Sequence, residues 1–352
     1  MYILLAVMVG FRYGVGVDTP NYMEAFSYIP KLQDLDAFSF LIFRFQPLYT
    51  LTNSICKTIL DDFVLVQILH ALLFYHSLYL LLKTLDAKKI FILFFFFCDV
   101  YWRPGMSAMR EGYALAFCFY AMYYYLQHKW ILYYLFVFIG FGYHTGAILF
   151  IIFPFLYIFK PLRTLNPFGF IFLLSSAFIA FSLLGILQNA LDGISDGSVT
   201  RYTVDDSESV FSPTTLIRDV TILLFIFSLC YMRLEVKYQS IIYLAVLYLV
   251  IDFLSSSYLG ILHRFSSHLS VCYYFAIIQI FNSLSKKRAL SLLAVCIIAY
   301  QPIMRGAYVL FFSETEVEYS RYCSVFSSDE EKKYYYKRIR SADAADYIIL
   351  KP

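Results

Sequence analysis

The stretch FVLVQILHALLFYHSLYLLLK, residues 63–83, decides the fold class of this chain. It carries one charged residue, Lys83, at its last position. A helix of about 20 apolar residues is what crosses the hydrocarbon core of a bilayer. Further apolar stretches follow and precede it along the chain, over residues 1–11, 39–60, 90–102, 107–127, 131–158, 167–190, 216–232, 238–255, 259–282 and 289–305.

The composition agrees with repeated membrane crossing. Hydrophobic residues make up 61% of the 352 residues and charged residues 15%, whereas soluble domains carry about 25% charged residues. Inside a bilayer the backbone must satisfy its own hydrogen bonds, and the alternating pattern of barrel strands is absent. We therefore expect an all-α, polytopic integral membrane helix bundle of about 9–11 membrane segments.

Two of the apolar stretches contain interruptions. Gln46-Pro47 interrupts 39–60, and Gly140 to Gly146, with His144 between them, interrupts 131–158. Basic residues favour the cytoplasmic side, and broken or re-entrant helices at these two places keep the lysine clusters there. The outside loops are then 11–38, 99–106, 191–215 and 255–260. We expect residues 1–305 to form the transmembrane domain, with loop 191–215 extracytoplasmic, and residues 306–352 to form a polar C-terminal tail.

Arg12 and Asp18 flank a glycine-containing turn after the first apolar stretch, and Tyr22 follows them. Gly14 and Gly16 permit a tight backbone turn, which would let the arginine and the carboxylate face a common ligand. Because charges beside apolar segments are expensive, each is a functional candidate. The alternative is an arginine that extends its head group to the membrane interface.

Arg103, Arg110 and Glu111 surround the start of the next long apolar stretch, in the sequence RPGMSAMREG of residues 103–112. The arginine fork matches phosphate oxygens. A helix N-terminus adds amide donors and positive potential. This combination predicts a pyrophosphate site, and the alternative is an interaction between Arg110 and Glu111 at the start of the helix.

Two further side chains lie inside apolar stretches. His144 can orient a ligand or move a proton, although a lone histidine is more often structural. Arg264 stands about one turn inside 259–282 and needs an anion or an acidic partner, for which Asp252 is a candidate.

Loop 191–215 contains Arg201 and Tyr202, followed by the carboxylates Asp205, Asp206 and Glu208. It is either a cover over a site or a solvated acidic loop. No histidine, cysteine and carboxylate set has metal-ligand spacing, so we expect no metal. Asp34-Leu-Asp36 is similar to the acidic pair of nucleotide-sugar transferases, but this short pattern is common by chance. No phosphate-binding glycine loop or nucleophile elbow is present.

These motifs, in this order over about residues 10–280, resemble those of the EpsG family, a branch of the Wzy-like O-antigen and exopolysaccharide polymerases. The resemblance lies in Arg12-x-x-x-Gly16-x-Asp18-x-x-x-Tyr22, in Gln46-Pro47, in Arg110-Glu111-Gly112, in Tyr143-His144, and in Arg264 before Tyr273-Tyr274. Gln46 stands where the family carries an acidic residue, and Glu111 where it carries glutamine, which puts direct side-chain roles at these two positions in doubt.

The resemblance implies a multi-pass enzyme of the bacterial inner (cytoplasmic) membrane with a GT-C-like polymerase architecture. It would be a glycosyltransferase that joins undecaprenyl-pyrophosphate-linked oligosaccharide repeat units into O-antigen or exopolysaccharide at the periplasmic face. Donor and acceptor would both be lipid-linked glycans, with membrane lipid around them and a chain-length regulator protein as a candidate partner. Neither a cofactor nor nucleic acid is expected.

Within this scheme the arginines bind the pyrophosphate, with Arg110 and Arg264 first and Arg12 and Arg103 in support. Candidates for the catalytic base are Asp18, His144 and Glu111, in that order. Tyrosine rings, which number 33 in the chain, would hold sugars, with Tyr22 and Tyr202 as the named candidates. Two other functions stay open: a transporter or flippase of lipid-linked sugars, and a membrane acyltransferase that modifies the polysaccharide.

Overall fold

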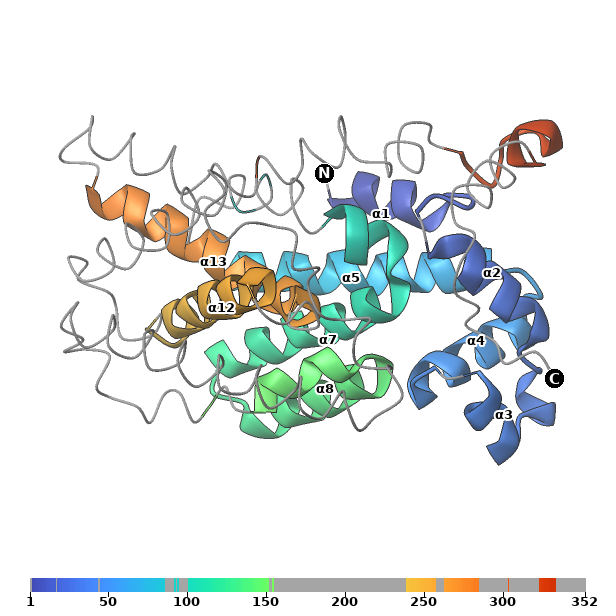
Figure 1. Ribbon diagram of the computed structural model, residues 1–352, viewed down its shortest axis with the longest axis horizontal. Coiled ribbons are helices and arrows are strands. Elements are labelled where there is room, and N and C mark those ends of the chain that lie inside the picture. The colour runs from blue at the N-terminus through green and yellow to red at the C-terminus, as the bar shows by residue number, and fades with distance from the viewer. Residues whose placement is uncertain are drawn as a thin grey trace. The chain divides into compact units, whose positions relative to one another are not determined.

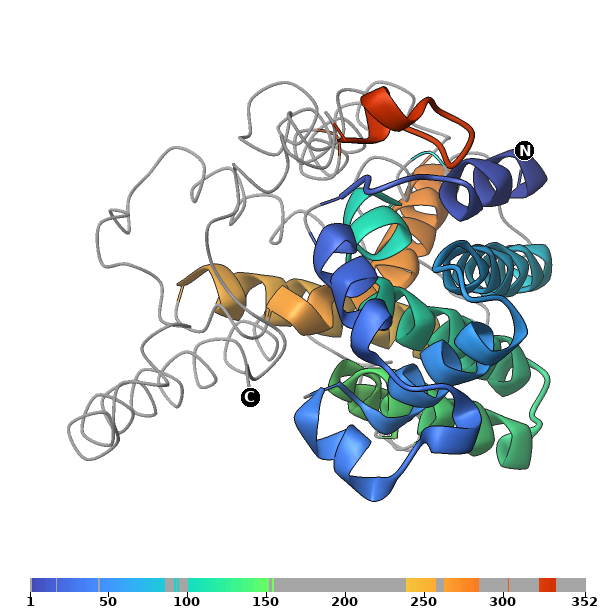
Figure 2. The same cartoon turned by 90° about the vertical axis from the view of Figure 1, so that its right-hand side faces the viewer.

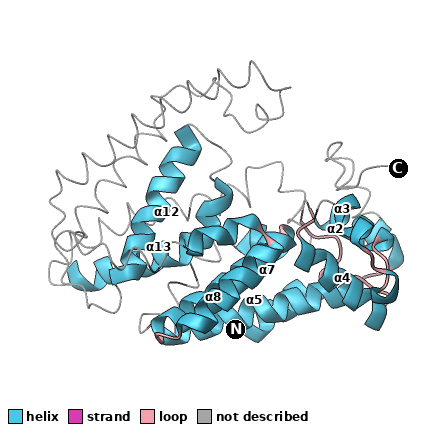
Figure 3. Cartoon of the chain, turned by 90° about the horizontal axis from the view of Figure 1, so that it is seen from below, coloured by secondary structure: helices cyan, strands magenta, loops and turns pink. Residues whose placement is uncertain are grey.

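The computed structural model describes residues 2–16, 18–43, 45–85, 92, 94, 101–151, 154, 239–257, 263–284, 303 and 323–333. This part of the chain is helical and contains no strand, which confirms the all-helical prediction (Figure 3). The chain divides into two units. The first comprises Met1–Lys89, Phe97–Ile151 and Ile303–Pro352, and the second comprises Ile90–Phe96 and Ile152–Pro302.

Four helices lie side by side in the first unit (Figure 1): α1 Tyr2–Gly10, α5 Val64–Thr84, α7 Met109–Leu126 and α8 Trp130–Tyr143. Helices α5 and α7 run parallel, because Tyr113 hydrogen bonds to the Val66 carbonyl and Tyr120 to His76. The C-terminal ends of both helices therefore meet at the same end of the bundle. Lys83, in the last turn of α5, and Lys129, which follows α7, therefore lie at the same end of the bundle; that this end is cytoplasmic stays a prediction.

Among the described residues, α5 is the one helix long and apolar enough to cross a membrane, and α8 is a shorter apolar helix. Of the other predicted segments, 167–190 and 216–232 lie outside the described residues, as does 289–305 apart from Ile303. The count of membrane segments stays a prediction.

Both predicted helix breaks are confirmed. Helix α3, Ala37–Ile42, ends before Gln46, whose extended backbone precedes α4, Pro47–Ile59. Proline suits this first helical position because it has no N–H to leave unpaired. Helix α8 ends where His144 adopts an extended backbone, and a 3₁₀ helix, η3 Thr145–Ile151, follows.

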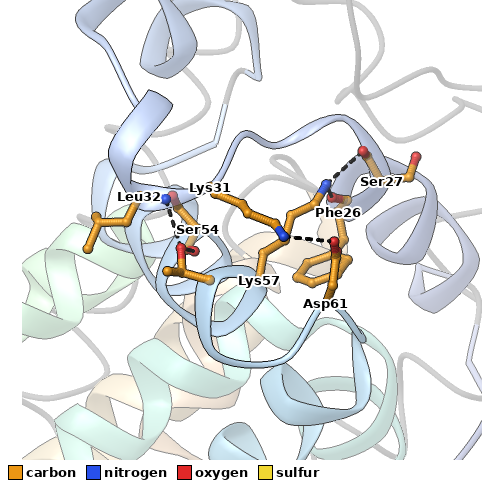
Figure 4. A network of polar contacts seen from close by, with 8 residues as sticks. Phe26, Ser27, Lys31, Leu32, Ser54, Lys57 and Asp61 are labelled. Atoms are coloured by element: carbon orange, nitrogen blue, oxygen red, sulfur yellow. Dashed lines mark hydrogen bonds and ion pairs between the residues drawn. The ribbon is translucent and has the colours of Figure 1, made fainter.

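Helix α2, Thr19–Tyr28, is fastened to α4 by a lysine (Figure 4). Lys57 donates to the carbonyl oxygens of Phe26 at 3.0 Å and Ser27 at 2.8 Å, which satisfies free carbonyls at the end of α2. A surface ion pair of 3.3 Å between Lys31 and Asp61 lies beside it.

The 3₁₀ turn η1, Leu32–Asp34, follows α2 and contains one residue of the acidic pair. Asp36, the other, accepts hydrogen bonds from the Ser39 amide and hydroxyl at 2.8 and 2.7 Å, which lower the pKa of its carboxyl group. It is the N-cap of α3.

The described helices of the second unit are α12, Gln239–Ser257, and α13, His263–Leu284, which pack against each other. Their contact includes stacked rings of Tyr248 and Tyr273, with centroids 4.8 Å apart and planes 20° apart. Asp252 and His268 are buried in this unit.

Candidate functional site

The start of α7 is packed unusually closely against its neighbours. A π-helical turn, η2 Tyr101–Ser107, leads into it through Pro104. A Cβ atom on Gly112 would lie 2.2 Å from the Pro104 carbonyl oxygen and 2.2 Å from His70 Nε2 on α5. Only glycine allows both groups to approach the helix here. The predicted helix start at Arg110-Glu111 is confirmed, since α7 begins at Met109.

Arg110, in the first turn of α7, is held by neutral groups. Its Nε donates to the Tyr22 hydroxyl at 3.4 Å, and one terminal nitrogen donates to the Gln46 side-chain oxygen at 3.3 Å. Since a guanidinium only donates, Gln46 must present its carbonyl oxygen. The guanidinium carbon also lies 5.0 Å from the Phe45 ring centroid, within cation–π range.

Among the described residues, the side-chain ion pair found is the one between Lys31 and Asp61. It does not involve Arg110. The half-buried charge of Arg110 therefore has neutral hydrogen-bond partners, with the Asp18 carboxylate acting on it electrostatically. The hydrogen bonds that the structure gives Arg110 go to Tyr22 and Gln46, and the interaction between Arg110 and Glu111 stays an alternative. A charge in these surroundings favours an anionic ligand.

Tyr22 belongs to this arginine site. It is 3% exposed, and its ring lies 5.5 Å from that of Tyr49, centroid to centroid. Burial, with the nearby Asp18 carboxylate in second place, raises the pKa of Tyr22 to about 12. The hydroxyl consequently stays protonated at physiological pH. The sequence assigned this residue to sugar binding, which the structure leaves as a prediction, but it does place Tyr22 against Arg110.

Arg12 follows α1 and is completely buried. It donates to the Val9 carbonyl oxygen. Its positive charge interacts electrostatically with Tyr49 on α4 and with His70 and Tyr75 on α5. The alternative of a head group extended into water at the membrane interface is therefore wrong for this structure. Arg12 instead supplies a cation to the interior of the first unit.

The loop that carries Asp18 contacts the turn that carries Arg103. The Asp18 amide donates to the Ser107 hydroxyl at 3.1 Å, and the Thr19 hydroxyl to the Met106 carbonyl at 3.4 Å. Gly16 has a φ of 100°, and a Cβ there would lie 2.8 Å from Ser107 Cβ. The Asp18 carboxylate interacts electrostatically with Arg110. The side chain of Arg103 lies outside the described residues.

Glu111 is 5% exposed, directly after Arg110 in the first turn of α7. A carboxylate there is favoured by the positive end of the helix dipole. The structure thus brings Arg12, Asp18, Tyr22, Arg110 and Glu111 into one region of the first unit, although they come from two separate stretches of sequence.

His144 follows a helix that reaches this region. The Tyr143 ring stacks on Tyr113 at 4.8 Å, and its hydroxyl hydrogen bonds to Thr52 at 2.7 Å. His144 Nδ1 accepts the Gly146 amide proton at 3.1 Å. In this geometry a neutral ring carries its proton on Nε2, and the role of His144 as a base stays a prediction.

Besides Arg103, two predicted site residues are not placed. Arg264 lies in the first turn of α13, in the second unit, and its side chain lies outside the described residues. Tyr202 and the rest of loop 191–215 also lie outside them. Convergence of Arg264 with Arg110 stays a prediction.

Sequence reasoning missed His70. This residue is completely buried in α5, with its ring 5.1 Å from that of Tyr113 and its Nε2 against Gly112. The signal was available, because a histidine in an otherwise apolar membrane-length helix is costly. Gln67, three residues earlier, is also buried on α5.

The model of the EpsG family matches residues 1–324 of the chain, which is most of its length and includes every residue of this site. No curated protein and no solved structure matches the chain significantly.

Proposed function

This chain belongs to the EpsG family, which implies a role in exopolysaccharide biosynthesis, and from that premise we propose that it is the polymerase. It joins undecaprenyl-pyrophosphate-linked oligosaccharide repeat units into exopolysaccharide or O-antigen. The reaction is glycosyl transfer at the periplasmic face of a bacterial inner membrane that the chain crosses several times with a GT-C-like architecture.

One observation carries this proposal. The half-buried guanidinium of Arg110 has the hydroxyl of Tyr22 and the amide of Gln46 as its hydrogen-bond partners, and both are neutral. An arginine whose hydrogen bonds go to neutral groups, and whose guanidinium is held against an aromatic face, suits a phosphate ligand. A lipid pyrophosphate supplies such an anion.

The chemistry follows from the charge that develops. An acceptor hydroxyl oxygen attacks the anomeric carbon of the donor sugar, and the bond from that carbon to the pyrophosphate oxygen breaks. Negative charge grows on the leaving pyrophosphate, where a fixed guanidinium stabilises it better than water does. The acceptor proton passes to a carboxylate, for which Asp18 is our first candidate and Glu111 the second. Arg12, Arg103 and Arg264 are the further cations of the proposal.

The test is a deletion strain complemented with Arg110→Ala or with Arg264→Ala. Both should abolish long-chain polysaccharide, seen as a ladder on a gel, while membrane extracts contain normal amounts of the protein. Single repeat units should persist on the lipid carrier or on the cell-surface acceptor. Lys129→Ala is the matched control, because it removes a cation whose contact is with the Tyr124 ring at the opposite end of α7.

A normal ladder in both arginine variants would refute the assignment. Disappearance of even the single repeat units from the cell surface would instead identify a flippase. A ladder of normal length with altered acetyl content would identify an acyltransferase.

A further inference from the structure

The C-terminal segment Cys323–Lys333, called the clamp below, pairs with the backbone on both sides of Arg12. The Tyr13 amide donates to the Cys323 carbonyl oxygen at 2.8 Å, and the Val325 amide donates to the Phe11 carbonyl oxygen at 2.9 Å. The two bonds place Arg12 opposite Ser324 in an isolated antiparallel bridge. Figure 2 shows the clamp, in red, beside the stretch that follows α1.

Side chains reinforce this pairing. The ring of Phe326 lies 5.4 Å from that of Phe11, and Lys332 Nζ lies 5.4 Å from the centroid of the Tyr13 ring. The clamp also folds on itself, since the Ser327 amide donates to the Ser324 carbonyl oxygen at 3.0 Å. Cys323 is 5% exposed. The clamp therefore contacts Phe11 and Tyr13, the residues on either side of Arg12, through backbone hydrogen bonds, an aromatic ring and a lysine side chain.

The position of Arg12 depends on that backbone. Its guanidinium is completely buried, so its place is set by the path of the chain from α1 to Gly14 rather than by solvent. Hydrogen bonds on both neighbours fix this path. We propose that the clamp is a positioning element for Arg12, and that the C-terminal segment lies on the same face of the membrane as Asp18 and Arg110.

The role assigned to Arg12 rests on the proposed function, whereas the location of the clamp does not. The family match ends at residue 324, so almost all of the clamp lies beyond the matched region. The clamp thus adds a functional element that the family match does not contain.

The first experiment tests location without using activity. Residues opposite each other in an antiparallel pair have Cα atoms about 5.5 Å apart, a separation that a disulfide spans. Tyr13→Cys in intact membranes should therefore form an oxidation-dependent disulfide with the native Cys323, detected as a joined peptide by mass spectrometry. Adding Cys323→Ser should remove that peptide, and Tyr28→Cys, at an exposed position on α2, should not form a disulfide with Cys323. No disulfide from Tyr13→Cys to Cys323 would overturn the proposal.

The second experiment tests whether the clamp acts through Arg12. Phe326→Ala removes the ring contact with Phe11 and should lower polymer yield about three- to tenfold at an unchanged protein level. Phe326→Tyr keeps the ring and should restore the yield. In an Arg12→Lys background, which has reduced activity, Phe326→Ala should cause no further loss.

An equal factor of loss in both backgrounds would show that the clamp supports the fold in general, and would overturn its positioning role. Wild-type polymer in Arg12→Lys alone would instead count against the assigned role of Arg12 in the proposed function. The disulfide experiment would then still decide where the clamp lies.

Discussion

Replacing Gly112 by alanine tests the close packing at the start of α7. The added Cβ would lie 2.2 Å from the Pro104 carbonyl oxygen and from His70 Nε2. The first of these atoms belongs to the backbone, so a side-chain rotation cannot relieve the contact. Overpacking of a tight interior costs about 1–3 kcal/mol, and contacts this short belong at the upper end. The higher helix propensity of alanine returns about 1 kcal/mol.

We therefore expect Gly112→Ala to lower the free energy of unfolding by about 2 kcal/mol. The shift of α7 that makes room for the methyl group should also displace Arg110 and reduce polymer formation. Gly10→Ala is the matched control, since its Cβ would meet atoms of Ile68 and Ala71 at 3.4 Å or more. Gly10→Ala should not lower the free energy of unfolding, and the higher helix propensity of alanine should raise it by up to about 1 kcal/mol.

The assay is thermal unfolding of the detergent-purified protein, with the polysaccharide ladder measured in the same strains. Wild-type melting temperature and a wild-type ladder for Gly112→Ala would refute the packing argument. Equal losses for Gly112→Ala and Gly10→Ala would show a general intolerance of α1 and α7 to substitution, and would also count against it.

Three further predictions concern the site and its support. Arg110→Lys should give at least tenfold less polymer than wild type, measured by ladder intensity, because a point charge lacks the bidentate fork; full activity would contradict a phosphate role. The pKa of Tyr22 is raised to about 12, so its contribution to the free energy of unfolding is complete below pH 10 and is lost as pH rises towards 12. Tyr22→Phe should remove this loss of stability from a series of unfolding measurements at alkaline pH. The same pH dependence in Tyr22→Phe and wild type would disprove the argument. Lys57→Met should destabilise the protein by about 1–2 kcal/mol through the lost hydrogen bonds to α2, whereas Lys31→Met should cost less than about 1 kcal/mol, since it loses an exposed ion pair; equal melting temperatures for the two variants would argue against this difference.

The sequence was most informative about where helices begin and end. Proline after Gln46 and three glycines around His144 are strong local signals, and both helix breaks are where these residues put them. The start of α7 was also predictable, because at Arg110 and Glu111 the sequence changes from a Pro-Gly turn to a helical pattern. Each of these features depends on neighbours within a few residues.

Features that depend on distant contacts were less accessible. Arg110 bonds to Tyr22, which is 88 residues away in the sequence, and to Gln46, which is 64 residues away. No periodicity in the sequence predicts contacts over such separations. The role of His70 depends on its contact with Gly112 across two helices. The clamp was expected only as a polar tail, because pairing of Tyr13 with Cys323 uses backbone atoms that every residue carries.

The rings between α7 and α8 have a mechanical consequence. Tyr113, Tyr143, Phe117, Phe136 and Tyr124 form a continuous series of stacked pairs, with centroids 4.8–6.1 Å apart. Sliding α7 past α8 would break all of these stacked pairs at once. The two helices must therefore move together as one rigid unit. A rearrangement of the first unit therefore has to occur at contacts other than the one between α7 and α8.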